Sequence, residues 1–92
     1  MASFEWHGEK ARKNLEKHGV SFEEAQTVFD DPLAGIKADP DHSSGEVREI
    51  IVGYSEKERL LLVSFTERGE MIRIIHARAA TQHERKAYEE ES

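Results

Sequence analysis

The first third of the chain carries apolar residues at the spacing of an α-helix. Between Gly8 and His18, the positions that fall at i, i+3, i+4 and i+7 are Ala11, Asn14, Leu15 and His18. This spacing predicts an amphipathic helix over residues 8–18, because the four positions share one helix face. Gly19 follows directly, where a glycine in the left-handed conformation commonly ends a helix.

A second helix is predicted to begin at Ser21. Ser21 and Glu24 have the spacing of a capping box, in which each side chain accepts a hydrogen bond from the backbone at the helix start. The side chains expected to form its buried stripe are Phe22, Ala25, Val28 and Phe29. The sequence Asp30-Asp31-Pro32 ends this helix, because proline lacks an N–H and disfavours helical backbone in the residue before it.

Beyond Pro32 the apolar residues fall into short β-rich runs separated by turn-forming residues. The runs cover residues 33–38, 47–54, 59–66 and 71–77. The connections between the later runs are short, and Gly69 supplies the positive φ of a tight hairpin. Short connections make neighbouring strands antiparallel. We therefore expect a three- or four-stranded antiparallel sheet.

The end of the chain predicts one more helix, weakly attached to the rest. Thr81 and Glu84 repeat the capping-box spacing and open a helix over residues 82–90, whose apolar content is only Ala87 and Tyr88. The predicted fold class is α+β: two N-terminal helices on the sheet and a short C-terminal helix, in a single domain over residues 1–92. Phe4-Glu5-Trp6 fits either a short edge strand or a hydrophobic cover on the helices.

The charge balance limits what the surface can bind. The 92 residues hold 13 Lys and Arg against 19 Asp and Glu, a net charge of -6, so any anion site must be local. Disulfides, thiolate zinc sites and cysteine nucleophiles are excluded, because the chain has no cysteine. No apolar run approaches the roughly 20 residues of a membrane span and the N-terminus lacks a signal pattern, so we expect a cytoplasmic protein with no membrane partner.

Candidate chemistry is concentrated in the last two strands and the hairpin between them. These segments carry Arg59, Arg68, Arg73, His76 and Arg78. Converging guanidinium groups would bind phosphate oxygens, although strand alternation places Arg73 and Arg78 on opposite faces. For any single arginine in a small charged domain, pairing with a carboxylate or exposure at a strand end is the commoner arrangement.

Other polar residues fit ordinary structural roles. His18 lies one turn after Asn14 and either caps the first helix at its C-terminus or acts in catalysis. The loop with Asp39, Asp41 and His42 is rich in turn formers and matches no metal-ligand spacing, so no metal site is predicted.

Several strings of residues together resemble a known family. Near the start they are Phe4-Glu5-Trp6, Lys10, Asn14, Lys17-His18-Gly19-Val20-Ser21-Phe22-Glu23-Glu24-Ala25 and Val28-Phe29-Asp30-Asp31-Pro32. Near the end they are Thr66-Glu67-Arg68-Gly69, Ile72-Arg73-Ile74-Ile75, Ala77-Arg78, Ala80-Thr81, Glu84-Arg85 and Tyr88. Their order and spacing resemble the BrnT family of toxins. The resemblance implies a RelE-like fold, ribonuclease activity without a cofactor, and an antitoxin with a ribbon-helix-helix DNA-binding part. That antitoxin would inhibit the toxin and make the complex a repressor of its own operon, so DNA is a partner only through the antitoxin.

Three positions depart from the family pattern. His7 stands where an acidic residue commonly follows the tryptophan, and Glu58 replaces a glycine usual in the strand connection. Both changes concern cap or turn geometry. His76 occupies a position often held by serine, where it either adds a titrating group or alters the site.

RNA cleavage without a metal needs a base for the 2′-hydroxyl proton, cations for the charge that develops on the phosphate, and an acid for the departing 5′-oxygen. The residues assigned to phosphate contact are Arg73 and Arg78, and those assigned to RNA binding are Arg59, Arg68 and Lys17. The candidates for acid and base are His76, His18 and Glu67. Histidine is preferred because its pKa near 6.5 permits either role at neutral pH, and Thr66 is expected to orient these groups.

A second function stays open. The acidic first half of the chain favours a non-catalytic module that receives a basic antitoxin segment and modulates its DNA binding. A small-ligand domain has no support, because the sequence contains no glycine-rich phosphate loop or dinucleotide fingerprint. An enzyme would arrest growth when expressed alone and leave cut RNA, whereas a binding module would be harmless.

Overall fold

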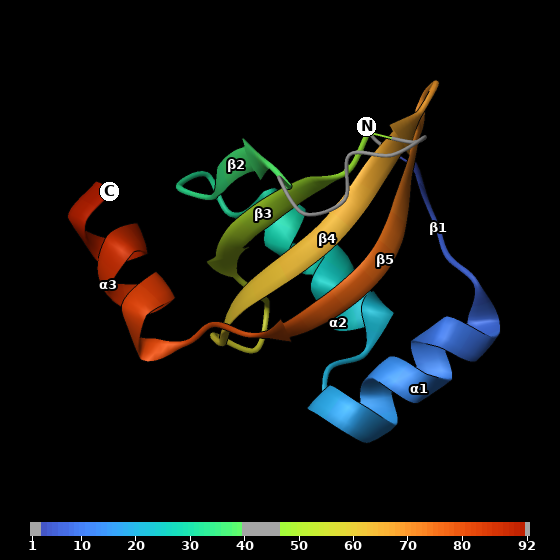
Figure 1. Ribbon diagram of the computed structural model, residues 1–92, viewed down its shortest axis with the longest axis horizontal. Coiled ribbons are helices and arrows are strands. Elements are labelled where there is room, and N and C mark those ends of the chain that lie inside the picture. Colours follow the sequence, from blue (N-terminus) through green and yellow to red (C-terminus); the bar gives the residue numbers. More distant parts are fainter. Residues whose placement is uncertain (1–2, 40–46, 92) are drawn as a thin grey trace.

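The computed structural model describes residues 3–39 and 47–91. Within these ranges it contains a five-stranded sheet, with helices α1 and α2 packed against strand β5 and helix α3 at the opposite end of the molecule (Figure 1). The predicted α+β class is confirmed. Asp41 and His42, from the loop for which no metal site was predicted, lie outside the described residues.

The two N-terminal helices form as their sequence signals predict. Helix α1 spans Gly8–His18 and ends at Gly19, whose φ of 69° lets its N–H donate to the carbonyl of Leu15 at 2.9 Å. Helix α2 spans Phe22–Thr27 and continues as the 3₁₀ turn η1 over Val28–Asp30. Only half of the predicted capping box forms: Ser21 accepts from the Glu24 N–H at 3.0 Å, while the Glu24 carboxylate turns inward to Arg59 and Ser55.

The sheet has the strand order β1-β5-β4-β3-β2. Four strands follow one another along the chain: β2 (Gly35–Ala38), β3 (Glu49–Tyr54), β4 (Leu60–Arg68) and β5 (Met71–Ala79). Each pairs antiparallel with the next strand in the sequence. The predicted meander is therefore confirmed. The fifth strand, β1 (Ser3–Glu5), pairs in parallel with β5. The three residues of β1 are too few for their sequence to predict the direction of pairing. The position of β1 beside β5 depends on how the two helices that follow β1 pack against the sheet.

An irregularity in β5 changes which side chains share a face. Ser64 of β4 pairs with His76 and Phe65 pairs with Ile74, so Ile75 is an extra residue at this point. As a result Ile74 and Ala77, three residues apart, both enter the core, and Arg73, His76 and Arg78 fall on the opposite face. The prediction that Arg73 and Arg78 lie on opposite faces is wrong, because simple alternation does not pass through a bulge.

The hydrophobic core lies between the helices and one face of the sheet. Its buried members are Val20, Phe22, Ala25, Val28, Ile51, Leu61, Val63, Phe65, Ile74 and Ala77. The rings of Phe4 and Phe65 lie 5.1 and 5.0 Å from that of Phe29, and Trp6 packs on Phe22. The Phe4-Glu5-Trp6 segment thus supplies both an edge strand and an aromatic cover, the two alternatives that the sequence left open.

Helix α3 (Gln82–Glu91) is attached through polar and aromatic groups. Its capping box is complete, since Thr81 N–H donates to Glu84 at 2.8 Å and Glu84 N–H donates to the Thr81 hydroxyl at 3.2 Å. No residue of α3 whose side chain is described is buried. Within the described ranges, the helices are too short or too polar to cross a membrane.

Candidate functional site

Two histidines from distant parts of the sequence meet beside β5. His18 is the last residue of α1 and His76 lies in β5, and their Nε2 atoms are 3.1 Å apart with the rings nearly perpendicular, at 85°. Both side chains are half-buried. One nitrogen must carry the proton of this contact while the other accepts it, so the pair holds a proton donor and a proton acceptor together.

Positive charge surrounds this pair. Burial lowers the pKa of His76, and the nearby charges of His18, Arg78 and Lys17 lower it further. His76 is therefore held neutral near pH 7 and is able to accept a proton. The exposed Lys17 precedes His18 on α1 and Arg78 follows His76 by two residues on the same strand face. The group formed by His18, His76, Lys17 and Arg78 is called the histidine site below.

Arg78 is held by a carboxylate from α3. Its Nη1 and Nη2 donate to the two carboxylate oxygens of Glu84 at 2.8 and 2.9 Å, and Nη1 also donates to the Ala79 carbonyl at 3.1 Å. The Arg78 guanidinium lowers the pKa of Glu84 to about 2, so this carboxylate stays charged throughout the neutral range. This two-pronged contact is the geometry in which arginine also binds phosphate.

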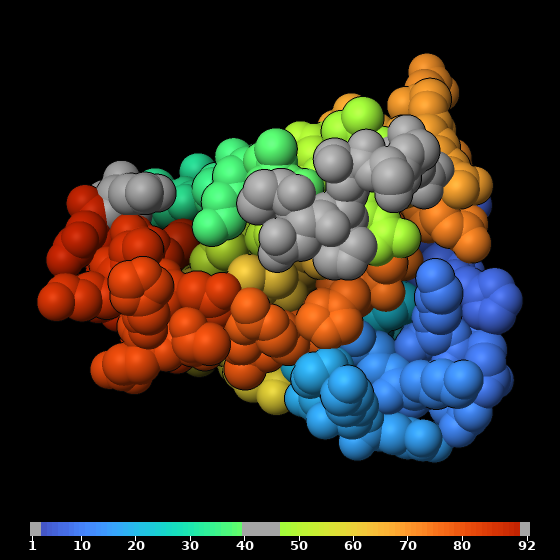
Figure 2. All heavy atoms as spheres, in the orientation of Figure 1, coloured from blue at the N-terminus to red at the C-terminus, as the bar shows by residue number. Residues whose placement is uncertain are grey.

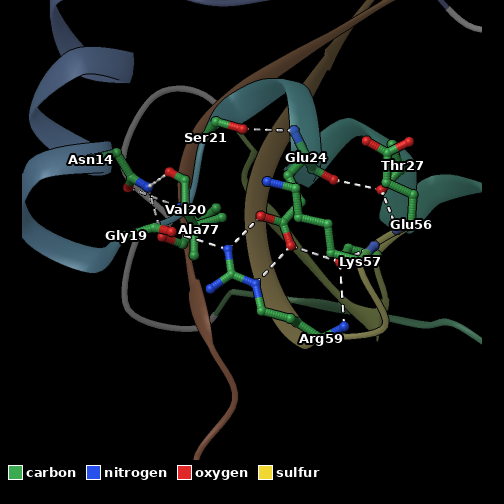
Figure 3. Close-up of polar contacts among 11 residues, drawn as sticks. Asn14, Gly19, Val20, Ser21, Glu24, Thr27, Glu56, Lys57, Arg59 and Ala77 are labelled. Atoms are coloured by element: carbon green, nitrogen blue, oxygen red, sulfur yellow. Dashed lines mark hydrogen bonds and ion pairs between the residues drawn. The ribbon is translucent and has the colours of Figure 1, made fainter.

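Asn14 holds the two histidine-bearing elements together, a role that the sequence pattern did not indicate. Its side chain donates to the carbonyls of Val20 at 2.9 Å and Ala77 at 2.8 Å, and accepts from the Ala77 N–H at 3.1 Å (Figure 3). Ala77 lies between His76 and Arg78, and Asn14 lies one turn before His18. Asn14 therefore takes the place of a neighbouring strand along this part of β5 and sets the spacing of the histidines.

Asn14 is among the residues that carry the family resemblance, and one physical signal in the sequence points to its role. A polar amide at an otherwise apolar helix position must find partners when it is buried, because an unpaired buried amide is costly. Asn14 was assigned to the apolar stripe of the first helix, and it is 6 % exposed. Its partners in β5 are 63 residues away, beyond the reach of any local pattern.

The arginines of β4, β5 and the turn before β4 do not gather in one pocket. Arg59 binds the Glu24 carboxylate through two nitrogens and donates to the Gly19 carbonyl at 3.0 Å (Figure 3). Glu24 is only 2 % exposed and also accepts from Ser55 at 2.7 Å. Arg59 lowers the pKa of Glu24 below its usual range. This arginine neutralises a buried charge and fastens the β3–β4 turn to α2.

Arg73 and Arg68 lie toward the hairpin end of β5 and β4. Arg73 approaches Glu5 on the neighbouring strand, with Nη1 3.5 Å from the carboxylate. It is five residues from Arg78, a separation of about 16 Å along an extended strand. Arg68 is exposed at the last position of β4. These two arginines are therefore separate from the histidine site.

The other two predicted site residues also lie on the hairpin side. Thr66 is 1 % exposed and its hydroxyl donates to the Val47 carbonyl at 2.7 Å. This bond fastens the segment before β3 to the sheet, and the role of Thr66 in orienting the acid and base stays a prediction. Glu67 is exposed and pairs in register with Ile72. In the part of the chain that is described, no three side chains of His, Asp or Glu gather into a potential metal site.

Comparison with known proteins supplies the family. The family model described as "Ribonuclease toxin, BrnT, of type II toxin-antitoxin system" matches residues 6–84. The chain belongs to the BrnT family. No match to a curated protein was found.

A solved BrnT has the same fold. The crystal structure of the Brucella abortus ribonuclease toxin BrnT superimposes with a TM-score of 0.65, covers 89 % of this chain and 100 % of its own, and shares 21 % sequence identity. At this identity the likeness concerns the fold alone. The BrnT resemblance and the α+β fold are thus confirmed, and the site residues stay predictions.

Proposed function

We propose that this BrnT family member cleaves RNA by attack of the 2′-hydroxyl on the adjacent phosphate, without a metal ion. The observation that carries the proposal is the contact between His18 and His76 beside Arg78. A donor and an acceptor of protons at hydrogen-bond distance, next to a phosphate-binding guanidinium, are the groups that this reaction requires. The family description, a ribonuclease toxin, supports RNA cleavage.

His76 is proposed as the base and His18 as the acid. The lowered pKa of His76 keeps it neutral and ready to take the 2′-hydroxyl proton. His18 then protonates the 5′-oxygen that leaves. The two imidazoles contact each other directly in the free protein, so they must part for the scissile phosphate to enter between them.

The cations divide into a central and a peripheral set. Arg78 and Lys17 lie close enough to His76 to lower its pKa, so we propose that they stabilise the charge that develops on the phosphate. Arg73 and Arg68 lie farther along the sheet, where we propose that they contact the RNA backbone, and exposed Glu67 stays a less favoured candidate for the acid or base. The proposal does not extend to Arg59, whose guanidinium is committed to Glu24 and Gly19.

The proposed partners follow from the type II toxin-antitoxin family. We propose an antitoxin with a ribbon-helix-helix DNA-binding part that inhibits the toxin in the cytoplasm, with RNA as the substrate and no cofactor. DNA would be contacted only by the antitoxin. A small reading frame for such a protein immediately downstream of the gene would support this.

The direct test is cleavage of RNA by the purified protein in EDTA. We expect products with 2′,3′-cyclic phosphate and 5′-hydroxyl ends, and no cleavage at a nucleotide that carries 2′-deoxyribose. His76→Ala and His18→Ala should each abolish the activity, whereas Lys10→Ala, an exposed change on α1, should not. Loss of cleavage in EDTA, or cleavage that survives the double change Arg73→Ala and Arg78→Ala, contradicts the proposed mechanism.

A non-catalytic antitoxin-binding module is the alternative. It is favoured by the pairing of Arg59, Arg73 and Arg78 with carboxylates in the free protein. Expression of the chain alone distinguishes the two functions. Growth arrest that depends on His76 supports the enzyme, and harmless expression with a changed operator affinity of the antitoxin supports the module.

A further inference from the structure

Glu84 occupies the position on Arg78 that a phosphate group would take. The nitrogens Nη1 and Nη2 of Arg78 donate to the Glu84 carboxylate at 2.8 and 2.9 Å. Both side chains are mostly covered: 31 % of Arg78 and 23 % of Glu84 are exposed. An RNA phosphate binds arginine through the same fork. The two anions therefore compete for one guanidinium.

Glu84 is presented to Arg78 by the first turn of α3. The backbone N–H of Thr81 donates to Glu84 Oε1 at 2.8 Å, and the Thr81 hydroxyl accepts from the Glu84 N–H. The carboxylate is thus fixed relative to the helix that carries it. Movement of α3 away from β5 would withdraw Glu84 and free the guanidinium.

Further contacts between α3 and the rest of the molecule come from Arg85 and Tyr88. The Tyr88 hydroxyl donates to Asp31 at 2.9 Å, its ring packs on Tyr54 at 5.6 Å, and Arg85 donates to the Tyr54 hydroxyl at 3.2 Å. Figure 2 shows α3, in red, forming one end of the molecule beside the orange surface of β5. A helix that places no described side chain in the core leaves the sheet at a small cost in free energy.

We propose that α3 is an autoinhibitory latch that competes with RNA phosphate for Arg78. With α3 docked, Glu84 fills the guanidinium fork; with α3 released, Arg78 accepts a phosphate next to His76. Tyr88 and Asp31 hold the far end of the latch and set how often it opens. This regulation concerns the proposed ribonuclease site and rests on Arg78 being its phosphate-binding residue.

The test measures binding rather than cleavage. A fluorescent single-stranded DNA oligonucleotide, which lacks the 2′-hydroxyl, is titrated with the natural protein and with Glu84→Gln, Tyr88→Phe and Glu90→Gln. Removal of the carboxylate charge should tighten binding about two- to fivefold, the range expected for one partly exposed ion pair. Tyr88→Phe leaves Arg78 and Glu84 intact and should tighten binding by a smaller factor. Thermal unfolding verifies that each variant is folded.

Glu90→Gln is the matched control, because it removes the same charge from an exposed position on the same helix. Equal tightening by Glu84→Gln and Glu90→Gln would mean a general charge effect and overturn the latch. Weaker binding by Glu84→Gln would mean that Glu84 positions Arg78 for its ligand, which overturns the proposal. Absence of binding by every variant would mean that phosphate does not reach Arg78, which also overturns it. Tightening specific to Glu84→Gln in a protein that cuts no RNA would uphold the latch and reject the ribonuclease.

Discussion

At the level of single residues, the ionisation of His76 connects the fold with the proposed chemistry. Burial and the charges of His18, Arg78 and Lys17 lower its pKa. Its folded pKa therefore lies below the unfolded value of about 6.5. The stability that depends on neutral His76 is complete above pH 6.5 and is lost as pH falls toward the folded pKa, since the unfolded chain then binds more protons.

The pH dependence of cleavage should report the same group. We expect kcat/KM to fall on the acidic side with an apparent pKa below 6.5, because protonated His76 cannot act as a base. Lys17→Gln removes a nearby positive charge and should move this limb to higher pH, whereas Lys10→Gln should leave it in place. An acidic limb that does not respond to Lys17 would contradict the assignment of His76 as the base.

Glu58 is strained in the β3–β4 turn. Its φ is 59°, a value that glycine adopts without the steric cost to a side chain. We therefore expect Glu58→Gly to raise the free energy of unfolding by about 0.5–1 kcal/mol. Lys57→Gly, in the same turn, should not stabilise the protein. Urea unfolding checks both, and equal effects of the two changes would contradict the strain.

Arg59 should affect stability rather than RNA binding. Arg59→Ala leaves the buried Glu24 carboxylate without its ion pair, and we expect the free energy of unfolding to fall by about 2 kcal/mol. Binding of the DNA oligonucleotide at a temperature where the variant is folded should change little. A large loss of binding with unchanged stability would instead support the original assignment of Arg59 to RNA.

At the level of elements, the β5 bulge and α1 together build the histidine site. The bulge at Ile75 puts Arg73, His76 and Arg78 on the face away from the core, and bulges commonly re-aim side chains at functional sites in this way. Asn14 then brings the end of α1 against β5, so that His18 reaches His76. Neither the bulge nor the Asn14 contact can be predicted from the spacing of the residues.

The tie between α1 and β5 predicts a specific loss. Asn14→Ala removes three hydrogen bonds and leaves backbone groups of Ala77 unpaired, so the free energy of unfolding should fall by about 3 kcal/mol. The variant should also lose cleavage at temperatures where it is folded. Ser21→Ala, which removes a helix cap worth about 1 kcal/mol, is the control and should retain activity. Retained activity in folded Asn14→Ala, with unchanged NMR signals of the His76 ring, would contradict the positioning role.

At the level of the whole molecule, a net charge of -6 coexists with a small cationic site. If about three cations contact RNA, the logarithm of the binding constant should fall with the logarithm of salt concentration with a slope of about -2. Raising salt from about 50 to about 200 mM should then weaken RNA binding about 20-fold. Fluorescence titrations at several salt concentrations measure this slope, and a slope near zero would contradict phosphate contacts as the source of affinity.

The sequence by itself determined the helices, a three- or four-stranded antiparallel sheet and the family. Gly19, the Thr81–Glu84 capping box and Gly69 act through neighbouring residues, so their effects are readable from local spacing. The family strings likewise required no coordinates.

Tertiary structure alone decided the parallel β1–β5 pairing, the bulge, the partner of each arginine and the meeting of His18 with His76. These features join residues separated by up to 68 positions, such as Ser3 and Met71, and depend on how the packed elements meet. The partners of a carboxylate depend on what packing brings near it. The Glu24 carboxylate binds Arg59 in place of the capping contact, whereas the Glu84 carboxylate binds both the Thr81 N–H and Arg78.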